Sequence, residues 1–130
     1  MELKEAFGAT LRQARLRKGL TQEHFSLVSS RTNVSLLERG GTSPTLVKLE
    51  ELCSVLEVHP VSLVTACYMR KENISDLKAF LAQVRKDLKA IERRFRGSPD
   101  FRDTKKINFA RDGKLEGVMR LIAAKDALAR

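Results

Sequence analysis

Apolar residues recur along this chain at intervals of three and four, the spacing that places side chains on one face of an α-helix. Near the N-terminus this spacing is shown by Leu3, Phe7, Leu11 and Ala14, and Gly19 ends the segment. Runs of β-branched residues are few, and the chain has one Tyr and no Trp. Because strands would alternate with a period of two, the pattern predicts an all-α fold.

The stretch from Gly19 to Gly40 contains two shorter segments that share one apolar side. That side is made of Leu20, Phe25, Val28, Val34 and Leu37. Thr21 and Ser30 precede the two segments, where a hydroxyl can accept from the unpaired N–H groups of a first helical turn. The sequence therefore predicts two short helices joined at the pair Ser29-Ser30, and the second helix keeps a polar side free.

Two more helices are expected in the N-terminal part of the chain. Ser43-Pro44 has the order of an N-cap followed by a first helical residue. The apolar face that follows consists of Leu46, Leu49, Leu52, Cys53 and Leu56. Val58-His59-Pro60 again places a proline at the expected start of a helix, and the next apolar face consists of Leu63, Val64 and Cys67. Five helices are thus predicted to be complete by about Arg70.

A separate helical segment is predicted to follow. Asn73 is suited to cap a helix that has Asp76 in its first turn. Apolar residues then recur in steps of three and four at Ile74, Leu77, Leu81, Val84, Leu88, Ile91 and Phe95. This a/d heptad pattern is typical of a helix whose seam packs against another helix. Gly97 and Pro99 end the pattern, and a last helix is expected at about residues 114–129.

Two partners for this seam remain open. The last helix could fold back on the heptad helix within one chain, or the seam could meet its copy in a second subunit. A parallel pair would bring Asp87 and Glu92 face to face, which argues against a simple parallel coiled coil. An antiparallel or exchanged dimer is compatible with both partners.

The formal net charge of +9 is unevenly distributed and favours a polyanionic partner. Residues 1–70 carry 9 Lys and Arg against 7 Asp and Glu, whereas residues 71–130 carry 16 against 9. The charge therefore does not mark the helix after Ser30. It indicates a positive field in the C-terminal half, which could speed association with DNA or be only a solvated helical surface.

Catalytic and membrane functions have little support in the sequence. Cys53 and Cys67 lack CxxC spacing and lie on apolar faces, which predicts buried free thiols. No Gly-rich phosphate loop or metal-ligand cluster is present, so we expect neither an enzyme, a metal nor a cofactor. No apolar stretch approaches the ~18 residues of a membrane span, and the N-terminus lacks a signal-peptide pattern. We expect a cytoplasmic protein.

The motifs of the N-terminal part resemble the Cro and phage-repressor type of helix-turn-helix regulators, often called the XRE family. The resemblance covers about residues 5–68 and rests on Leu11-Arg12-x-x-Arg15-x-x-x-Gly19-Leu20-Thr21-Gln22-Glu23, Val34-Ser35-x-Leu37-Glu38-Arg39-Gly40, Ser43-Pro44-Thr45-Leu46 and Leu56-x-Val58. It implies a five-helix, lambda-repressor-like DNA-binding domain at residues 1–71. Residues 72–130 would then form a two-helix segment for dimerisation or partner binding. The distance from Thr21-Gln22 to Glu38 is about two residues shorter than the common family pattern, so the second helix or the turn is expected to be trimmed.

The resemblance also implies roles for individual side chains. The helix at about residues 30–38 would meet base edges through Ser30, Arg31, Thr32, Asn33, Ser35 and Leu36. DNA phosphates would be contacted by Thr21, Gln22, Arg39, Thr42 and Lys48. Arg15 and Glu38 would form a buried ion pair between the first helix and the end of the recognition helix. Arg31 suits bidentate donation to guanine, a pairing worth ~1–3 kcal/mol of discrimination, although a phosphate contact is an equal alternative.

The implied function is a sequence-specific transcriptional regulator of bacterial or phage type, located at the nucleoid. Binding to double-stranded DNA as a homodimer on a palindromic operator would repress transcription by occupancy. A different class of function is an antitoxin-like interaction protein. In that case the C-terminal helices would bind a partner protein while the N-terminal domain represses its own operon.

Overall fold

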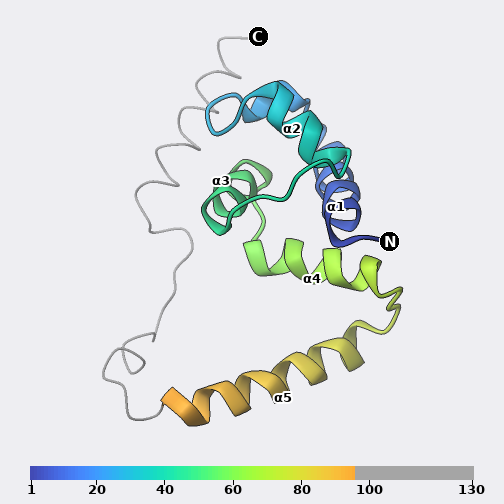
Figure 1. Ribbon diagram of the computed structural model, residues 1–130, viewed down its shortest axis with the longest axis vertical. Coiled ribbons are helices and arrows are strands. Elements are labelled where there is room, and N and C mark those ends of the chain that lie inside the picture. The colour runs from blue at the N-terminus through green and yellow to red at the C-terminus, as the bar shows by residue number, and fades with distance from the viewer. Residues whose placement is uncertain (96–130) are drawn as a thin grey trace.

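The computed structural model describes residues 1–95, with side chains described up to Glu92 (Figure 1). The elements are the helices α1 (Leu3–Arg17), η1 (Gln22–Phe25), α2 (Arg31–Glu38), α3 (Leu46–Leu56), α4 (Pro60–Lys71) and α5 (Leu77–Phe95), of which η1 is a 3₁₀ helix. No strand occurs in this part of the chain, so the predicted all-α fold is confirmed there. The predicted last helix and the break at Gly97 lie outside the described residues.

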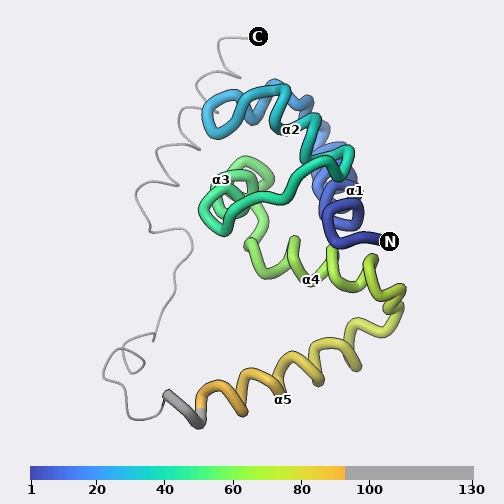
Figure 2. Tube along the Cα trace, in the orientation of Figure 1, coloured from blue at the N-terminus to red at the C-terminus, as the bar shows by residue number. Residues whose placement is uncertain are grey.

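One hydrophobic core joins the first five elements. α1 packs against α2 and α4, while α3 packs against α4 and η1 (Figure 2). The largest fully buried side chains of the core are Leu11, Phe25, Val34, Leu37, Leu52, Cys53 and Leu56. Each such apolar side chain contributes about 1.5–3 kcal/mol on burial. The core therefore stabilises α2 through its Val34 and Leu37 side, as the apolar pattern predicted.

The segment expected as a second α-helix is a single 3₁₀ turn of four residues. This trimmed element accounts for the short distance between Thr21 and Glu38. Phe25 from η1 is fully buried, so the short element still anchors its chain segment in the core. α2 begins where predicted, because the Ser30 Oγ accepts a hydrogen bond of 3.1 Å from the backbone N–H of Asn33.

The predicted start of α3 at Ser43-Pro44 is wrong. Thr45 is the N-cap, and its hydroxyl accepts a 3.1 Å hydrogen bond from the backbone N–H of Lys48. The placement of Leu46 on the apolar face is also wrong, because this residue opens the helix and is 85% exposed. The start of α4 follows the prediction: Pro60 is its first residue, and His59 Nδ1 accepts from the backbone N–H two residues on.

The boundary between α4 and α5 differs from the prediction. Asn73 does not cap a helix start; it adopts a left-handed conformation with φ 53° and helps to end α4, where the N–H of Ile74 donates to the carbonyl of Met69. Asp76 caps α5 instead, because its carboxylate accepts from the N–H of Ala79 at 3.0 Å. Ile74 therefore precedes α5 and does not belong to its seam.

α5 stands apart from the bundle in Figure 1, where it runs below α4 and away from α2. It is not among the helix pairs that pack closely within the described residues. Its seam residues Leu77, Leu81, Leu88 and Ile91 are consequently exposed.

Between residues 1 and 95, no one helix combines the length and hydropathy needed to cross a bilayer. Only α3 and α4 taken together meet that test, and the chain bends by 102° between them.

Candidate DNA-binding surface

The two sides of α2 differ sharply in burial. Val34 is fully buried and Leu37 is 1% exposed, and both face the core. Residues at steps of three and four on a helix share one side, and the opposite side of α2 is formed by Thr32, Ser35, Leu36 and Arg39. Of these four, only Ser35 is half-buried and the others are exposed. We call these four residues the outer face of α2.

Arg15 and Glu38 are joined by a bidentate ion pair. The Nε of Arg15 lies 2.5 Å from one carboxylate oxygen of Glu38, and its second guanidinium nitrogen donates to the other oxygen at 3.0 Å. A third donor of Arg15 reaches the carbonyl of Leu20 at 2.9 Å. The side chain of Glu38 is only 4% exposed. The pair ties α1 to the last residue of α2 and also to the chain that enters η1.

Gln22 adds a third donor to the same carboxylate. Its amide nitrogen lies 2.9 Å from a carboxylate oxygen of Glu38. Burial alone would raise the pKa of Glu38, but hydrogen bonds from Arg15 and Gln22 and the charge of Arg15 outweigh burial and lower this pKa. Glu38 in turn raises the pKa of Arg15 through their hydrogen bond. The carboxylate is therefore held in its charged form by both η1 and α1.

The first turn of α2 is fixed by side-chain hydrogen bonds. Ser30 caps the helix, and the amide nitrogen of Asn33 donates to the hydroxyl of Ser29 at 2.8 Å. Ser30 and Asn33 were predicted to meet base edges, but in the structure both stabilise the start of the helix. Ser29 was predicted only as part of the junction between the two helices, and its hydrogen bond to Asn33 was not predicted.

Arg31 projects from the first turn of α2 and is largely exposed. One of its guanidinium nitrogens lies 3.3 Å from the carboxylate of Glu23 in η1, and both side chains are 72% exposed. An exposed ion pair of this kind is worth about 0–1 kcal/mol, so the guanidinium of Arg31 can leave Glu23 at little cost. Glu23 matched the family motif but was given no role from sequence.

Leu36, the exposed leucine of α2, is 39% exposed because the turn after the helix partly covers it. A Cβ atom added to Gly41 would lie 2.4 Å from a methyl carbon of Leu36, so the leucine packs on the bare backbone there. Gly40 has φ 72°, the left-handed conformation that ends a helix. The remaining surface of Leu36 stays on the outer face of α2.

Gly8 allows α1 and α2 to approach closely. A Cβ atom at this position would lie 2.4 Å from the carbonyl oxygen of Leu37 and 2.5 Å from that of Glu38. Both atoms belong to the backbone, so no side-chain rotation could relieve the contact. The sequence offered no signal for this role, because a single glycine within a helical pattern is ordinarily tolerated.

Lys48, expected at a DNA phosphate, is held within the protein. Its ammonium group donates to the carbonyl oxygen of Val28 and lies 2.9 Å from the carboxylate of Glu51. The side chain is 29% exposed. Lys48 thereby connects α3 to the turn that leads into α2.

The other residues predicted at phosphates lie near the two ends of the short motif. Thr21 is exposed before η1, and its N–H donates to His24 Nδ1 at 2.9 Å. Arg39 is exposed at the end of α2, and its Nε lies 3.3 Å from the carbonyl of Ser35. Thr42 is half-buried in the loop after α2. Of these three residues, only Arg39 belongs to the outer face of α2; Thr21 and Thr42 lie in the segments before η1 and after α2.

The two cysteines lie in the core, away from this surface. Cys53 is fully buried and Cys67 is 3% exposed, and neither is in a disulfide. Burial raises the pKa of Cys53 to about 12 and also raises that of Cys67. Both thiols are consequently protonated and unreactive at neutral pH. Within the described residues, no group of three His, Cys, Asp or Glu side chains could hold a metal ion.

Comparison with known proteins assigns the chain to a family. A helix-turn-helix domain model matches residues 6–65. The HTH-type transcriptional regulator y4dJ of Sinorhizobium fredii is 40% identical over 67 residues, which make up 50% of this chain and 87% of that protein. Crystal structures of the clp gene regulator ClgR from Corynebacterium glutamicum are similar in fold. One has 26% identity and a TM-score of 0.50 over 60% of this chain and 99% of its own.

A second ClgR structure has 25% identity and a TM-score of 0.51, and it covers 70% of this chain and 90% of its own. That share is larger than residues 1–71 alone make up, so the likeness extends beyond α4. Together the matched domain and the relatives agree with the helical fold. The chain belongs to the helix-turn-helix transcriptional regulators, which are DNA-binding proteins and not enzymes.

Proposed function

We propose that this regulator is sequence-specific and contacts base edges in the major groove through the outer face of α2. The proposal rests on the burial of Val34 and Leu37, which fixes the rotation of α2 about its own axis. This rotation leaves Thr32, Leu36 and Arg39 exposed. A major groove of about 12 Å width accepts one α-helix in this manner. The Arg15–Glu38 pair would hold the helix in place before DNA arrives.

The side chains have distinct roles in this proposal. Thr32 and the exposed part of Leu36 would pack on thymine methyl groups, and Ser35 would lie between them. Arg31 would donate to guanine O6 and N7 after leaving Glu23. Arg39 would contact phosphate at the end of α2, as would Thr21 and Thr42 in the flanking loops.

Gln22 can serve both the protein and the DNA backbone. Its amide nitrogen carries two hydrogens, and only one is needed for the bond to Glu38. The second hydrogen would be free to donate to a phosphate at the start of η1. Lys48 and Asn33 would support the helix and its turn without touching DNA.

Dimerisation through α5 would complete the operator-binding unit. The seam residues Leu77, Leu81, Leu88 and Ile91 are exposed on a helix that stands apart from the bundle. Two copies joined by this seam would place two α2 helices on two half-sites, and occupancy of a promoter would repress transcription. The same seam would serve an antitoxin-like role if it bound another protein instead.

Quantitative DNA binding tests the base-contact proposal. Affinities of the Arg31→Ala protein are measured on operator duplexes that differ at single base pairs. Loss of preference at one guanine position assigns Arg31 to a base, with an expected cost of about 1–3 kcal/mol. A uniform loss on all duplexes assigns it to phosphate.

Sedimentation equilibrium tests the dimer. The Leu81→Glu/Leu88→Glu protein is expected to be a monomer, whereas Leu46→Glu, which changes an exposed leucine of α3, is expected to dimerise like the original chain. A full-length chain that is monomeric at micromolar concentration would contradict the homodimer. It would leave the seam to a different partner protein.

A further inference from the structure

The DNA-binding domain itself has few free cations. Binding to DNA depends strongly on neutralising phosphates with Lys and Arg side chains. Residues 1–70 contain 9 Lys and Arg against 7 Asp and Glu. Many of these cations make contacts within the protein: Arg15 with Glu38, Lys48 with Glu51 and Val28, Lys18 with Glu57, Arg31 with Glu23, and Arg70 with Gln13. Arg39 is the one cation among the four residues of the outer face of α2, and Arg31 adds a second cation in the first turn of the helix.

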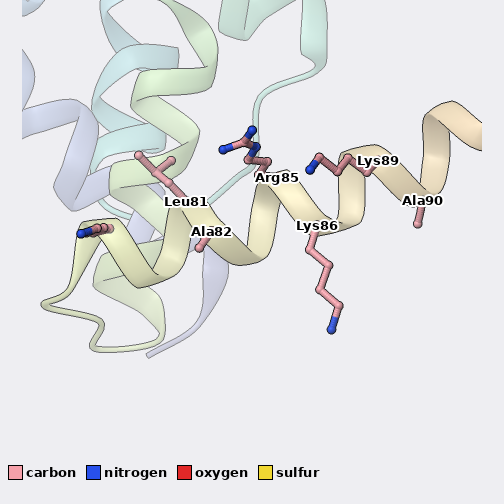
Figure 3. A pocket seen from close by; sticks show the side chains of 7 residues that line it. Leu81, Ala82, Arg85, Lys86, Lys89 and Ala90 are labelled. Atoms are coloured by element: carbon pink, nitrogen blue, oxygen red, sulfur yellow. The ribbon is translucent and has the colours of Figure 1, made fainter.

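α5 carries the cations that this domain lacks. Among the side chains that are described, up to Glu92, the exposed cations of α5 are Lys78, Arg85, Lys86 and Lys89. At 3.6 residues per turn these four side chains fall within a sector of roughly 100° around the helix axis, and we call them the basic stripe. Figure 3 shows Lys86 and Lys89 as extended side chains, with the short side chains of Ala82 and Ala90 on either side along the helix.

The basic stripe is not neutralised by the described part of the chain. None of its four cations makes an ion pair with a carboxylate among the described residues. Asp87 lies on the other side of α5 and accepts a hydrogen bond from Gln83 at 2.9 Å. Glu92 lies at the far end of the stripe, almost a turn beyond Lys89. The stripe thus presents positive charge to solvent.

The stripe and the seam occupy different sides of α5. The centre of the seam lies about a third of a turn away from the centre of the stripe. Pairing of the seam with a second copy would therefore leave both stripes uncovered. A dimer would then carry two basic stripes in addition to two α2 helices.

We propose that the basic stripe of α5 binds the DNA phosphate backbone and supplies much of the sequence-independent affinity of this regulator. Figure 1 shows α5 below α4 and away from α2, so the phosphates that α5 meets would lie outside the half-site contacted by α2 of the same chain. This inference extends the proposed function by assigning base contacts to α2 and most of the charge-dependent attraction to α5.

The salt dependence of binding to a long duplex without an operator tests this inference. The full-length Lys86→Gln/Lys89→Gln protein is compared with Arg70→Gln/Lys71→Gln, which removes the same charge from the exposed end of α4. Each lost phosphate contact reduces the slope of log K against log salt by about 0.9, so the stripe variant should lose up to about 1.8. The control variant should keep the original slope.

Equal slopes for the two variants and the original chain would overturn the inference. An equal reduction in both variants would also overturn it, because net charge and not the stripe would then be responsible. All substitutions are at exposed positions, and circular dichroism and sedimentation would establish that fold and assembly are retained. Since the duplex contains no operator, the result does not depend on whether α2 contacts bases. A lack of operator preference in the original chain would count against the proposed function alone.

Discussion

Arg15 in α1 and Glu38 at the end of α2 are joined by two parallel hydrogen bonds of 2.5 and 3.0 Å, in a site where the carboxylate is 4% exposed. Because the guanidinium fork matches the planar carboxylate, this geometry restrains both the distance and the angle between the two helices. The orientation of α2 is therefore determined by contacts within the folded protein.

Breaking this pair should destabilise the fold. In the Glu38→Gln protein the guanidinium of Arg15 stays buried without a countercharge, and the free energy of unfolding should fall by about 3 kcal/mol. The Arg15→Met/Glu38→Leu protein should lose less than the sum of the single changes, since no charge is left unpaired. Urea unfolding measures both. Glu57→Gln, which removes the partner of Lys18 in an exposed pair, should change stability by less than about 1 kcal/mol. An equally small effect of Glu38→Gln would show that the Arg15–Glu38 pair does not stabilise the fold.

The stability of the protein should fall in acid because of Glu38. Burial opposes its ionisation, but the hydrogen bonds from Arg15 and Gln22 prevail, so the pKa in the folded state is lower than the ordinary value of 4.5. The unfolded chain then binds more protons between these two pKa values, and stability is lost as the pH falls from the ordinary value through the folded one. Unfolding measured between neutral pH and pH 3 should show a shallower decline in Glu38→Gln. Parallel pH profiles for the two proteins would exclude Glu38 as the cause.

Gly8→Ala should destabilise the protein and weaken DNA binding. Alanine ordinarily stabilises a helix by about 0.5–1 kcal/mol relative to glycine. Here its Cβ would meet the carbonyl oxygens of Leu37 and Glu38 at 2.4 and 2.5 Å, and forcing the helices apart should cost about 1–3 kcal/mol. Thermal unfolding measures the change in stability, which should be a decrease. An increase would show that α1 and α2 do not approach so closely.

Lys48→Met should weaken DNA binding without changing its salt dependence. The ammonium holds the carbonyl of Val28 in the turn before α2, and a hydrogen bond to a charged group is worth about 1.5–3 kcal/mol. Loss of this contact should loosen the turn and reduce affinity about tenfold. If Lys48 contacted a phosphate instead, the slope of log K against log salt would fall by about 0.9. Titrations at several salt concentrations distinguish these outcomes, and Glu51→Gln serves as the control that leaves the lysine in place.

The features that local sequence determines were predictable. Ser30 and His59 cap their helices because a cap depends on a side chain and the few N–H groups after it. The N-cap of α5 was predicted wrongly, because Asn73 and Asp76 can both cap a helix. Only the left-handed conformation of Asn73 at the end of α4 decides between them. Local pattern also could not show that Leu46 would be exposed in a first turn.

The features that depend on contacts between distant segments were less predictable. The Arg15–Glu38 pair came from the resemblance to a family and not from spacing, since 23 residues separate the two. The roles of Gly8 and Lys48 had no signal at all, because each depends on which backbone carbonyl the fold brings close. The sequence also did not show that the side chain of Asn33 forms a hydrogen bond with Ser29 at the start of α2.

Selection of bound sequences from a random duplex pool tests whether the outer face of α2 contacts bases. The original chain should enrich a two-fold symmetric motif, and Leu36→Ala should lose the preference for thymine at one equivalent position in each half. Leu46→Ala, a change of an exposed leucine outside α2, should enrich the original motif. Two outcomes would contradict base contact by the outer face of α2. One is a pool with no enriched sequence, and the other is enrichment of the original motif by both Leu36→Ala and Thr32→Ala.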